Sequence, residues 1–211
     1  MSEDGFKQAE KLAEYLKQRK INAVFCSPLK RALETAESVA RLHQLAAQPV
    51  EGLTDLDFGK WEGMSIENVK TQCKEIYELW RERPDLAKIP DGESLQEASQ
   101  RSLNALNKII ADCKQGIIVI VIHRVITKLL ECALLGLEDS HFWNIEQDTC
   151  GVTTFLHNGI IFVLKHHNDI SFLKTHARRT LSPTLAPLAR FGRFTDTLSA
   201  FPSSCCGVNT I

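Results

Sequence analysis

A histidine and an arginine directly follow the most apolar stretch of the chain. Residues 116–122 read Gly-Ile-Ile-Val-Ile-Val-Ile, and His123 and Arg124 come next. An unbroken β-branched run is typical of a strand that is buried on both faces of a parallel sheet. Ligands of open α/β sheets bind where the strands end, so an imidazole and a guanidinium placed there would form an anion site beside the next helix. In the alternative interpretation, His123 only caps that helix and Arg124 is solvated.

Two other segments hold side chains suited to anion binding and to acid–base chemistry. Arg31 lies in the first turn of a predicted helix that follows a short apolar strand at residues 23–26. A guanidinium can bind two oxygens of one anionic group. Asp55 lies on the irregular segment 49–63 beside aromatic rings, where the pKa of a carboxyl group can be raised for proton donation. Each has a structural alternative, because an isolated arginine on a helix and most loop carboxylates are simply solvated.

Strands and helices alternate along the chain, and this order positions the three segments. Apolar residues at helical spacing predict five helices, over residues 6–16, 28–40, 65–83, 94–113 and 125–135. Ser27 and Pro28 are placed to open the second of them. The turn sequence Asn158-Gly159 predicts a hairpin after the last helix. The alternation predicts an α/β fold in which helices cover the sheet.

The net charge and the distribution of apolar residues indicate which kinds of binding partner to expect. The 211 residues carry 25 Lys and Arg against 26 Asp and Glu, a formal net charge of −1, which argues against nucleic acid and membrane surfaces as partners. No run approaches the roughly 20 apolar residues of a membrane span. The first residues have neither the basic start nor the apolar core of a secretory signal, so we expect a cytoplasmic protein.

Cysteine and histidine spacing predicts no metal site. The seven cysteines form an odd set without zinc-type pairing, which favours reduced thiols. Four histidines in the second half of the chain show no ligand spacing on a shared face: His141, His157, His166 and His167. We therefore expect no metal and no other cofactor.

The character of the chain changes after residue 174. Residues 175–211 are rich in Ser, Thr and Pro, and their apolar residues fit neither the helical nor the strand period. This composition predicts one domain over residues 1–174 and a disordered or loosely packed tail over residues 175–211.

Together and in this order, the segments resemble the histidine phosphatase superfamily, also called the phosphoglycerate mutase-like family. The resemblance covers residues 2–173. It rests on the Ser-Pro-Leu-Lys-Arg-Ala helix around Arg31, the Phe-Gly-Lys-Trp-Glu-Gly loop at residues 58–63, the Asp-Gly-Glu-Ser helix start at residues 91–94 and the strand that ends in His123. It implies a three-layer α/β/α fold and a phosphomonoesterase that needs no metal and acts on a small phosphorylated metabolite, most similar to α-ribazole phosphatases and other small phosphatases.

The resemblance also implies roles for the site residues. In the family a histidine on the first strand attacks the phosphoryl group, while two arginines and a second histidine hold the equatorial oxygens. Arg31 resembles the second of these arginines, and His123 resembles the second histidine. Arg124 stands where many members have Gly and would add a cation at the rim of the phosphate pocket.

The acid that protonates the leaving oxygen is a glutamate in most members. Asp55 falls at that position, one methylene shorter than glutamate, and Asp57 and Glu62 are nearby alternatives. Proton donation to the leaving group completes the mechanism that the resemblance implies, in which positioning and charge stabilisation supply most of the catalysis.

The family's first strand, which ends in Arg-His-Gly and carries the nucleophile, has no counterpart here. No Arg-His-Gly occurs, and the first histidine, His43, ends the second helix. The resemblance thus implies an N-terminally truncated fold that lacks its central strand, and impaired phosphomonoester hydrolysis. The alternatives are a non-catalytic phosphate-binding protein or an inactive gene fragment, with a mutase-type isomerase less favoured. A misassigned start codon or a degraded gene would each account for the difference.

Loss of this strand also has a structural consequence. In the family it pairs beside the strand of His123, so its loss would leave the amides of Val119 and Val121 unpaired in the sheet interior, which is costly. We therefore expect poor solubility, or rescue of the sheet by another chain or by part of the tail. An exposed sheet edge would also promote self-association.

Overall fold

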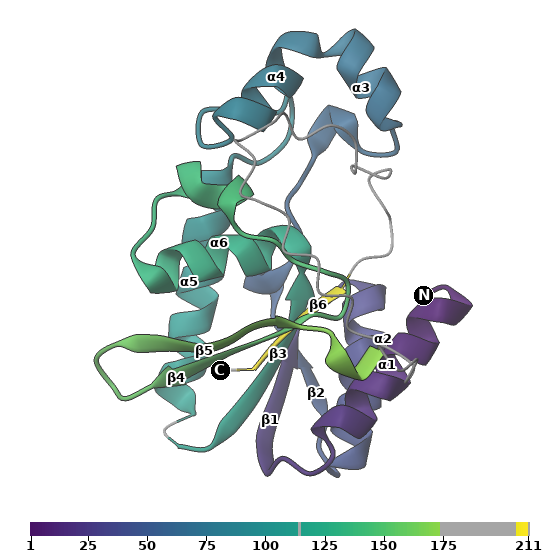
Figure 1. The fold of residues 1–211 in the computed structure, drawn as a ribbon, viewed down its shortest axis with the longest axis vertical. Helices are drawn as coiled ribbons and strands as arrows, with labels where there is room; N and C mark the ends of the chain where they lie inside the picture. Colours follow the sequence, from purple (N-terminus) through teal and green to yellow (C-terminus); the bar gives the residue numbers. More distant parts are fainter. Residues whose placement is uncertain (114, 174–205, 211) are drawn as a thin grey trace, which may run out of the picture.

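A six-stranded sheet forms the centre of the protein (Figure 1). The computed structural model describes residues 1–113, 115–173 and 206–210. The strand order is β2-β1-β3-β6-β4-β5. The strands span Ile21–Cys26 (β1), Ala47–Pro49 (β2), Ile117–His123 (β3), Val152–His157 (β4), Phe162–Asp169 (β5) and Cys206–Thr210 (β6). β1 is parallel to β2 and β3, and β4 and β5 form the antiparallel hairpin that Asn158-Gly159 predicts.

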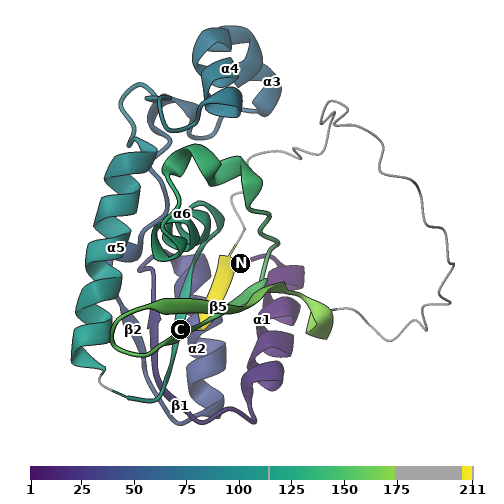
Figure 2. The ribbon, with the colours of Figure 1, turned by 60° about the vertical axis from the view of Figure 1, so that its left-hand side comes forward.

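Helices cover both faces of this sheet, which gives the three-layer α/β/α arrangement that the resemblance implies. α1 and α2 pack on one face, α5 and α6 on the other, and α3 and α4 lie beyond one end of the sheet (Figures 1 and 2). The helices span Glu3–Leu16 (α1), Lys30–Leu42 (α2), Ile66–Gln72 (α3), Lys74–Glu82 (α4), Leu95–Asp112 (α5) and Arg124–Leu135 (α6). The described residues also form four short 3₁₀ helices: Glu51–Leu53 (η1), Gly59–Trp61 (η2), Asp139–Asn144 (η3) and Ser171–Leu173 (η4).

The apolar run of β3 is buried on both faces, as its composition predicts. Ile118, Ile120 and Ile122 pack into the core beneath α5 and α6, and Val119 and Val121 pack into the core beneath α1 and α2. Successive side chains of a strand point to opposite faces, so one uninterrupted β-branched segment serves both layers. The position of β3 in the sheet is therefore fixed by packing on both faces. Its last residue, His123, lies directly before the first residue of α6.

β6 occupies the place beside β3 that the sequence predicts to be empty. It lies between β3 and β4, antiparallel to the first and parallel to the second (Figure 1). The backbones of Val119 and Val121 are in register with it, so the sheet interior is paired. The tail thus supplies the strand, which is one of the two rescues that we expect from the sequence. The predicted disorder or loose packing of residues 175–205 and 211 lies outside the described residues.

Helix boundaries differ from the sequence prediction at the start of α2 and between α3 and α4. α2 begins at Lys30, and Leu29 holds the N-cap position without a side-chain cap. The Ser27 hydroxyl instead accepts a hydrogen bond from the Leu29 amide, 3.2 Å away, within the turn after β1. The helix predicted over residues 65–83 is divided at Cys73, whose φ of −128° ends α3 before α4 begins.

The start of α5 and the end of α6 follow their predicted signals. Ser94 and Glu97 form a capping box at the start of α5, and Gly136, with φ +70°, ends α6 in the left-handed conformation that glycine favours. Among the residues that the structure describes, we find no helix with the length and apolar character needed to cross a membrane.

Candidate active site

A cavity of about 700 Å³ opens where β1 and β3 end. Arg31 enters it from α2, after β1, and Arg124 enters it from α6, after β3. The segment 54–66 forms another side, and aromatic rings from α4 and η3 close it: Tyr77, Trp80, Phe142 and Trp143. The cavity therefore lies at the carboxyl ends of the strands, as expected for a ligand site of an α/β sheet.

Three predicted site residues from three distant segments meet at this cavity. Arg31 Nη2 lies 2.7 Å from Asp55 Oδ2, and His123 Nδ1 lies 3.5 Å from the same oxygen. Asp55 Oδ1 accepts a hydrogen bond from the Leu56 amide at 3.0 Å. Arg31 and Asp55 line the cavity, whereas His123 is fully buried behind them. The Asp55 carboxylate thus joins the arginine and the histidine.

Some polar atoms of this cluster have no hydrogen-bond partner among the described residues. Arg31 Nε and both ring nitrogens of His123 are buried without a hydrogen-bond partner among the described residues. The 3.5 Å separation of His123 from Asp55 is too long for a strong hydrogen bond. Buried polar atoms are nearly always satisfied, so unpaired donors next to a cavity are expected where a ligand binds.

The electrostatics of the cluster set its protonation states. Burial, assisted by the charges of Arg31 and Arg101, lowers the pKa of His123 to about 3, so its imidazole is neutral at neutral pH. Burial raises the pKa of Asp55, although Arg31 and the Leu56 amide oppose the shift. A carboxyl group with a raised pKa takes up a proton more readily, which suits a general acid.

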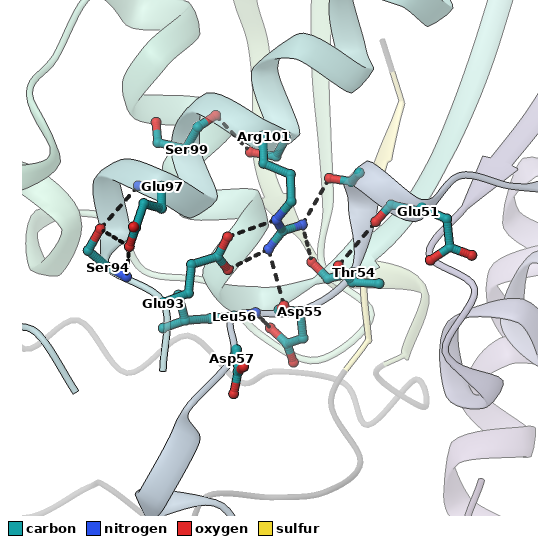
Figure 3. A network of polar contacts seen from close by, with 12 residues as sticks. Glu51, Thr54, Asp55, Leu56, Asp57, Glu93, Ser94, Glu97, Ser99 and Arg101 are labelled. Carbon is teal, nitrogen blue, oxygen red and sulfur yellow. Dashed lines mark hydrogen bonds and ion pairs between the residues drawn. The ribbon is translucent and has the colours of Figure 1, made fainter. Parts of the chain in front are cut away.

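Arg101 holds the Asp55 segment in place (Figure 3). Its guanidinium donates two hydrogen bonds to the Glu93 carboxylate, at 2.9 and 2.7 Å, and three more to the carbonyl oxygens of Gly52, Thr54 and Asp55. These bonds connect α5 to the backbone of the segment that presents Asp55. Sequence reasoning missed Arg101, because nothing in a helix interior signals a contact with a segment that lies 46 to 49 residues away.

The two glycine-containing motifs of the sequence pack against each other. Gly59 has φ +47°, and a Cβ on Gly59 would overlap the backbone of Pro90 and Gly92. The Lys60 amide donates to the Pro90 carbonyl at 3.0 Å, and the Glu93 amide donates to the Asp57 carbonyl at 2.9 Å. This close approach of two turns positions Glu93 for Arg101 and so supports the Asp55 segment.

The remaining predicted residues also line the cavity. Asp57 Oδ1 accepts a hydrogen bond from the Gly59 amide at 2.8 Å, which stabilises the turn. Glu62 and Arg124 are at the wall, and neither makes a salt bridge with a described residue. Of the three carboxylates that the sequence offers, only Asp55 contacts both Arg31 and His123.

Comparison with known proteins identifies the family. A family model described as "Histidine phosphatase superfamily (branch 1)" matches residues 1–170. The chain belongs to the histidine phosphatase superfamily. Among its relatives, phosphoserine phosphatase 1 of Hydrogenobacter thermophilus is 32% identical over 70% of each chain. The adenosylcobalamin/alpha-ribazole phosphatase of Escherichia coli is 28% identical over 68% of this chain and 71% of its own. The structure of YhfR from Bacillus stearothermophilus superposes with a TM-score of 0.79 at 26% identity, covering 82% of this chain and 87% of that one.

Membership in the histidine phosphatase superfamily confirms the predicted family and fold. The roles assigned to Arg31, Asp55, His123 and Arg124 remain predictions that the geometry supports. Within residues 1–113, 115–173 and 206–210, no group of three or more His, Cys, Asp or Glu side chains is arranged to hold a metal ion.

The lowered pKa of His123 predicts how the stability of this superfamily member depends on pH. The unfolded chain binds a proton at His123 below its ordinary pKa of 6.5, whereas the folded chain does not do so until about 3, so stability falls as pH falls below 6.5. Between pH 7 and pH 5 this amounts to about 2 kcal/mol. We expect His123→Asn to flatten the pH dependence of the unfolding free energy by about that amount.

Chemical denaturation at both pH values measures this effect. The raised pKa of Asp55 has the opposite effect, because the folded state then gains stability as pH falls. Asp55 is present in both proteins, so the difference between the variant and the wild type reports His123. His166→Asn, at an exposed position on β5, is the control for the loss of a histidine away from the cavity. Equal pH dependence in His123→Asn and wild type would show that His123 is protonated normally in the fold.

Proposed function

We propose that the chain binds the phosphoryl group of a small phosphorylated metabolite at Arg31, Asp55 and His123, as a site of the phosphomonoesterase type. The observation that supports this proposal is the meeting of these three residues at the end of β1 and β3, with unpaired donors beside a cavity. Relatives of the chain include phosphatases, and a site for phosphate is the feature that phosphatases share.

Each residue has a distinct role in this proposal. The Arg31 guanidinium binds phosphoryl oxygens through charge-assisted hydrogen bonds, using the Nε donor that has no partner among the described residues. The neutral imidazole of His123 is buried behind Asp55, 3.5 Å from its Oδ2, and supports the position of that carboxyl group. Asp55, with its raised pKa, gives its proton to the leaving oxygen of the ester.

We further propose that phosphoryl transfer through a phosphohistidine is impaired in this chain. The sequence contains no Arg-His-Gly, the motif whose histidine is the nucleophile in the family that the chain resembles. Among the described residues no histidine lines the cavity, and His123 is fully buried. A non-catalytic phosphate-binding protein is the second candidate, supported by the same two observations.

Two measurements on the purified chain test these statements separately. Inorganic phosphate at ten times its Kd should stabilise the fold by about 1.4 kcal/mol, which raises the Tm by about 4 °C. Incubation with a ³²P-labelled phosphomonoester should give slow turnover and no acid-labile label on histidine. Fast turnover with a labelled histidine would overturn the proposed impairment and leave the phosphate site intact. An unchanged Tm at high phosphate would overturn the phosphate site itself.

A further inference from the structure

Two further cations line the same cavity as Arg31. Arg124 and Lys128 lie one turn apart on α6, so they share one face of that helix, and both face the cavity. Neither makes a salt bridge with a described residue, and neither interacts with Asp55 in the way that Arg31 does. Neither charge takes part in the contacts that join Arg31, Asp55 and His123.

The ammonium group of Lys128 lies against two aromatic rings. Only 7% of the residue is exposed, and its Nζ lies 4.6 Å from the ring centroid of Phe142 and 4.7 Å from that of Trp143. Cation–π contacts attract the ammonium group, yet they do not neutralise it. The side chain is thus fixed at the cavity wall with its charge directed toward two rings and the cavity.

The charge of Lys128 is poorly compensated by its surroundings. Burial and the positive charge of Arg124 lower the pKa of Lys128 to about 8, against the opposing effects of Glu131, Cys132 and Glu146. The ammonium group is therefore mostly protonated at neutral pH, without an ion-pair partner among the described residues. Charged groups that are buried in proteins are normally paired, so an unpaired one at a cavity wall points to an anion supplied by a ligand.

The size of the cavity allows such a ligand. Its volume of about 700 Å³ lies within the range of roughly 300–1,000 Å³ typical of small-molecule sites, far more than a phosphoryl group needs. Apolar rings of Trp61, Tyr77 and Trp80 line the space. The cavity thus combines apolar walls with one cation from α2 and two cations from α6.

We propose that the cavity takes phosphomonoesters whose leaving group carries a second anionic group, and that Lys128, assisted by Arg124, binds that anion. This inference rests on the proposed function, because it assumes that the phosphoryl group is held at Arg31. Lys128 would then be a specificity-determining residue: it contributes little to the affinity for a phosphoryl group and much to the choice among esters.

A pair of ligands that differ only in the second anion tests this proposal. Phenyl phosphate and 4-carboxyphenyl phosphate are titrated into the chain by calorimetry at pH 7. We expect the wild type to bind the carboxylate-bearing ester about tenfold more tightly. Lys128→Met should abolish this preference while leaving the Kd for phenyl phosphate within twofold, and Lys128→Arg, which keeps the charge, should restore most of it. The preference of the wild type should also decline as pH rises through about 8.

Lys108→Met is the matched control, because it removes an exposed lysine of α5 with the same change in net charge. It should leave both affinities unchanged. Equal affinity of the wild type for the two esters, or an equal loss of both in Lys128→Met, would overturn the proposal while leaving the phosphate site intact. If phenyl phosphate itself does not bind, the proposed function fails, and this inference fails with it.

Discussion

Replacing Arg31 by methionine is expected to weaken the binding of inorganic phosphate about 100-fold. The guanidinium is the cation that contacts Asp55, and its Nε is a buried donor without a hydrogen-bond partner among the described residues. A hydrogen bond to a charged group contributes about 1.5–3 kcal/mol, and a 100-fold loss corresponds to about 2.7 kcal/mol. Calorimetric titration of phosphate at pH 7 measures the change.

A second arginine of the same helix provides the control. Arg41 makes an exposed salt bridge with Glu10, at 2.7 Å, and lies away from the cavity. Arg41→Met therefore removes the same charge from α2 and should leave the Kd for phosphate within twofold. Equal affinities in Arg31→Met and Arg41→Met would mean that phosphate does not bind at Arg31.

The replacement of Arg101 by methionine is expected to destabilise the fold by about 3 kcal/mol. Its guanidinium donates five hydrogen bonds that connect α5 to Glu93 and to the segment ending at Asp55. Removing one partner of a largely buried, hydrogen-bonded ion pair leaves the other charge and several carbonyl groups unsatisfied. Denaturation with urea measures the loss of stability.

The same variant should also weaken phosphate binding, by about tenfold, because Asp55 is no longer held beside Arg31 and His123. Arg83→Met is the matched control: Arg83 also donates two hydrogen bonds to one carboxylate, that of Asp85, but on an exposed surface. Its Tm and its phosphate affinity should equal those of the wild type. A stable Arg101→Met variant with unchanged affinity would contradict a positioning role for Arg101.

The convergence of the site could be predicted because it follows from the sheet. Arg31 lies in the first turn of the helix that follows β1, and His123 is the last residue of β3. Because β1 and β3 are parallel neighbours, both side chains reach the same edge of the sheet. The β-branched run of β3 is a strong local signal for a strand that is buried on both faces. The capping box at Ser94 and the turn at Asn158 are local signals of the same kind, and the elements form where these residues place them.

Other features could not be predicted, because they depend on contacts between distant segments. The bonds of Arg101 to the segment before Asp55 join residues that no local pattern connects. The strand β6 lies in a region whose apolar residues fit no period, and it pairs with β3 and β4, which are distant from it in the sequence. Ser27, a good helix cap by residue type, satisfies the amide of Leu29 in the turn instead.

A crystal structure of the full chain with bound phosphate would show whether Arg31, Asp55 and His123 form the phosphate site. Crystals are soaked with inorganic phosphate and compared with crystals soaked with chloride at equal ionic strength. We expect a phosphate ion within hydrogen-bond distance of the Arg31 guanidinium, on the side of Asp55. A phosphate bound only elsewhere, or a cavity that stays empty at concentrations that saturate binding in solution, would contradict this expectation.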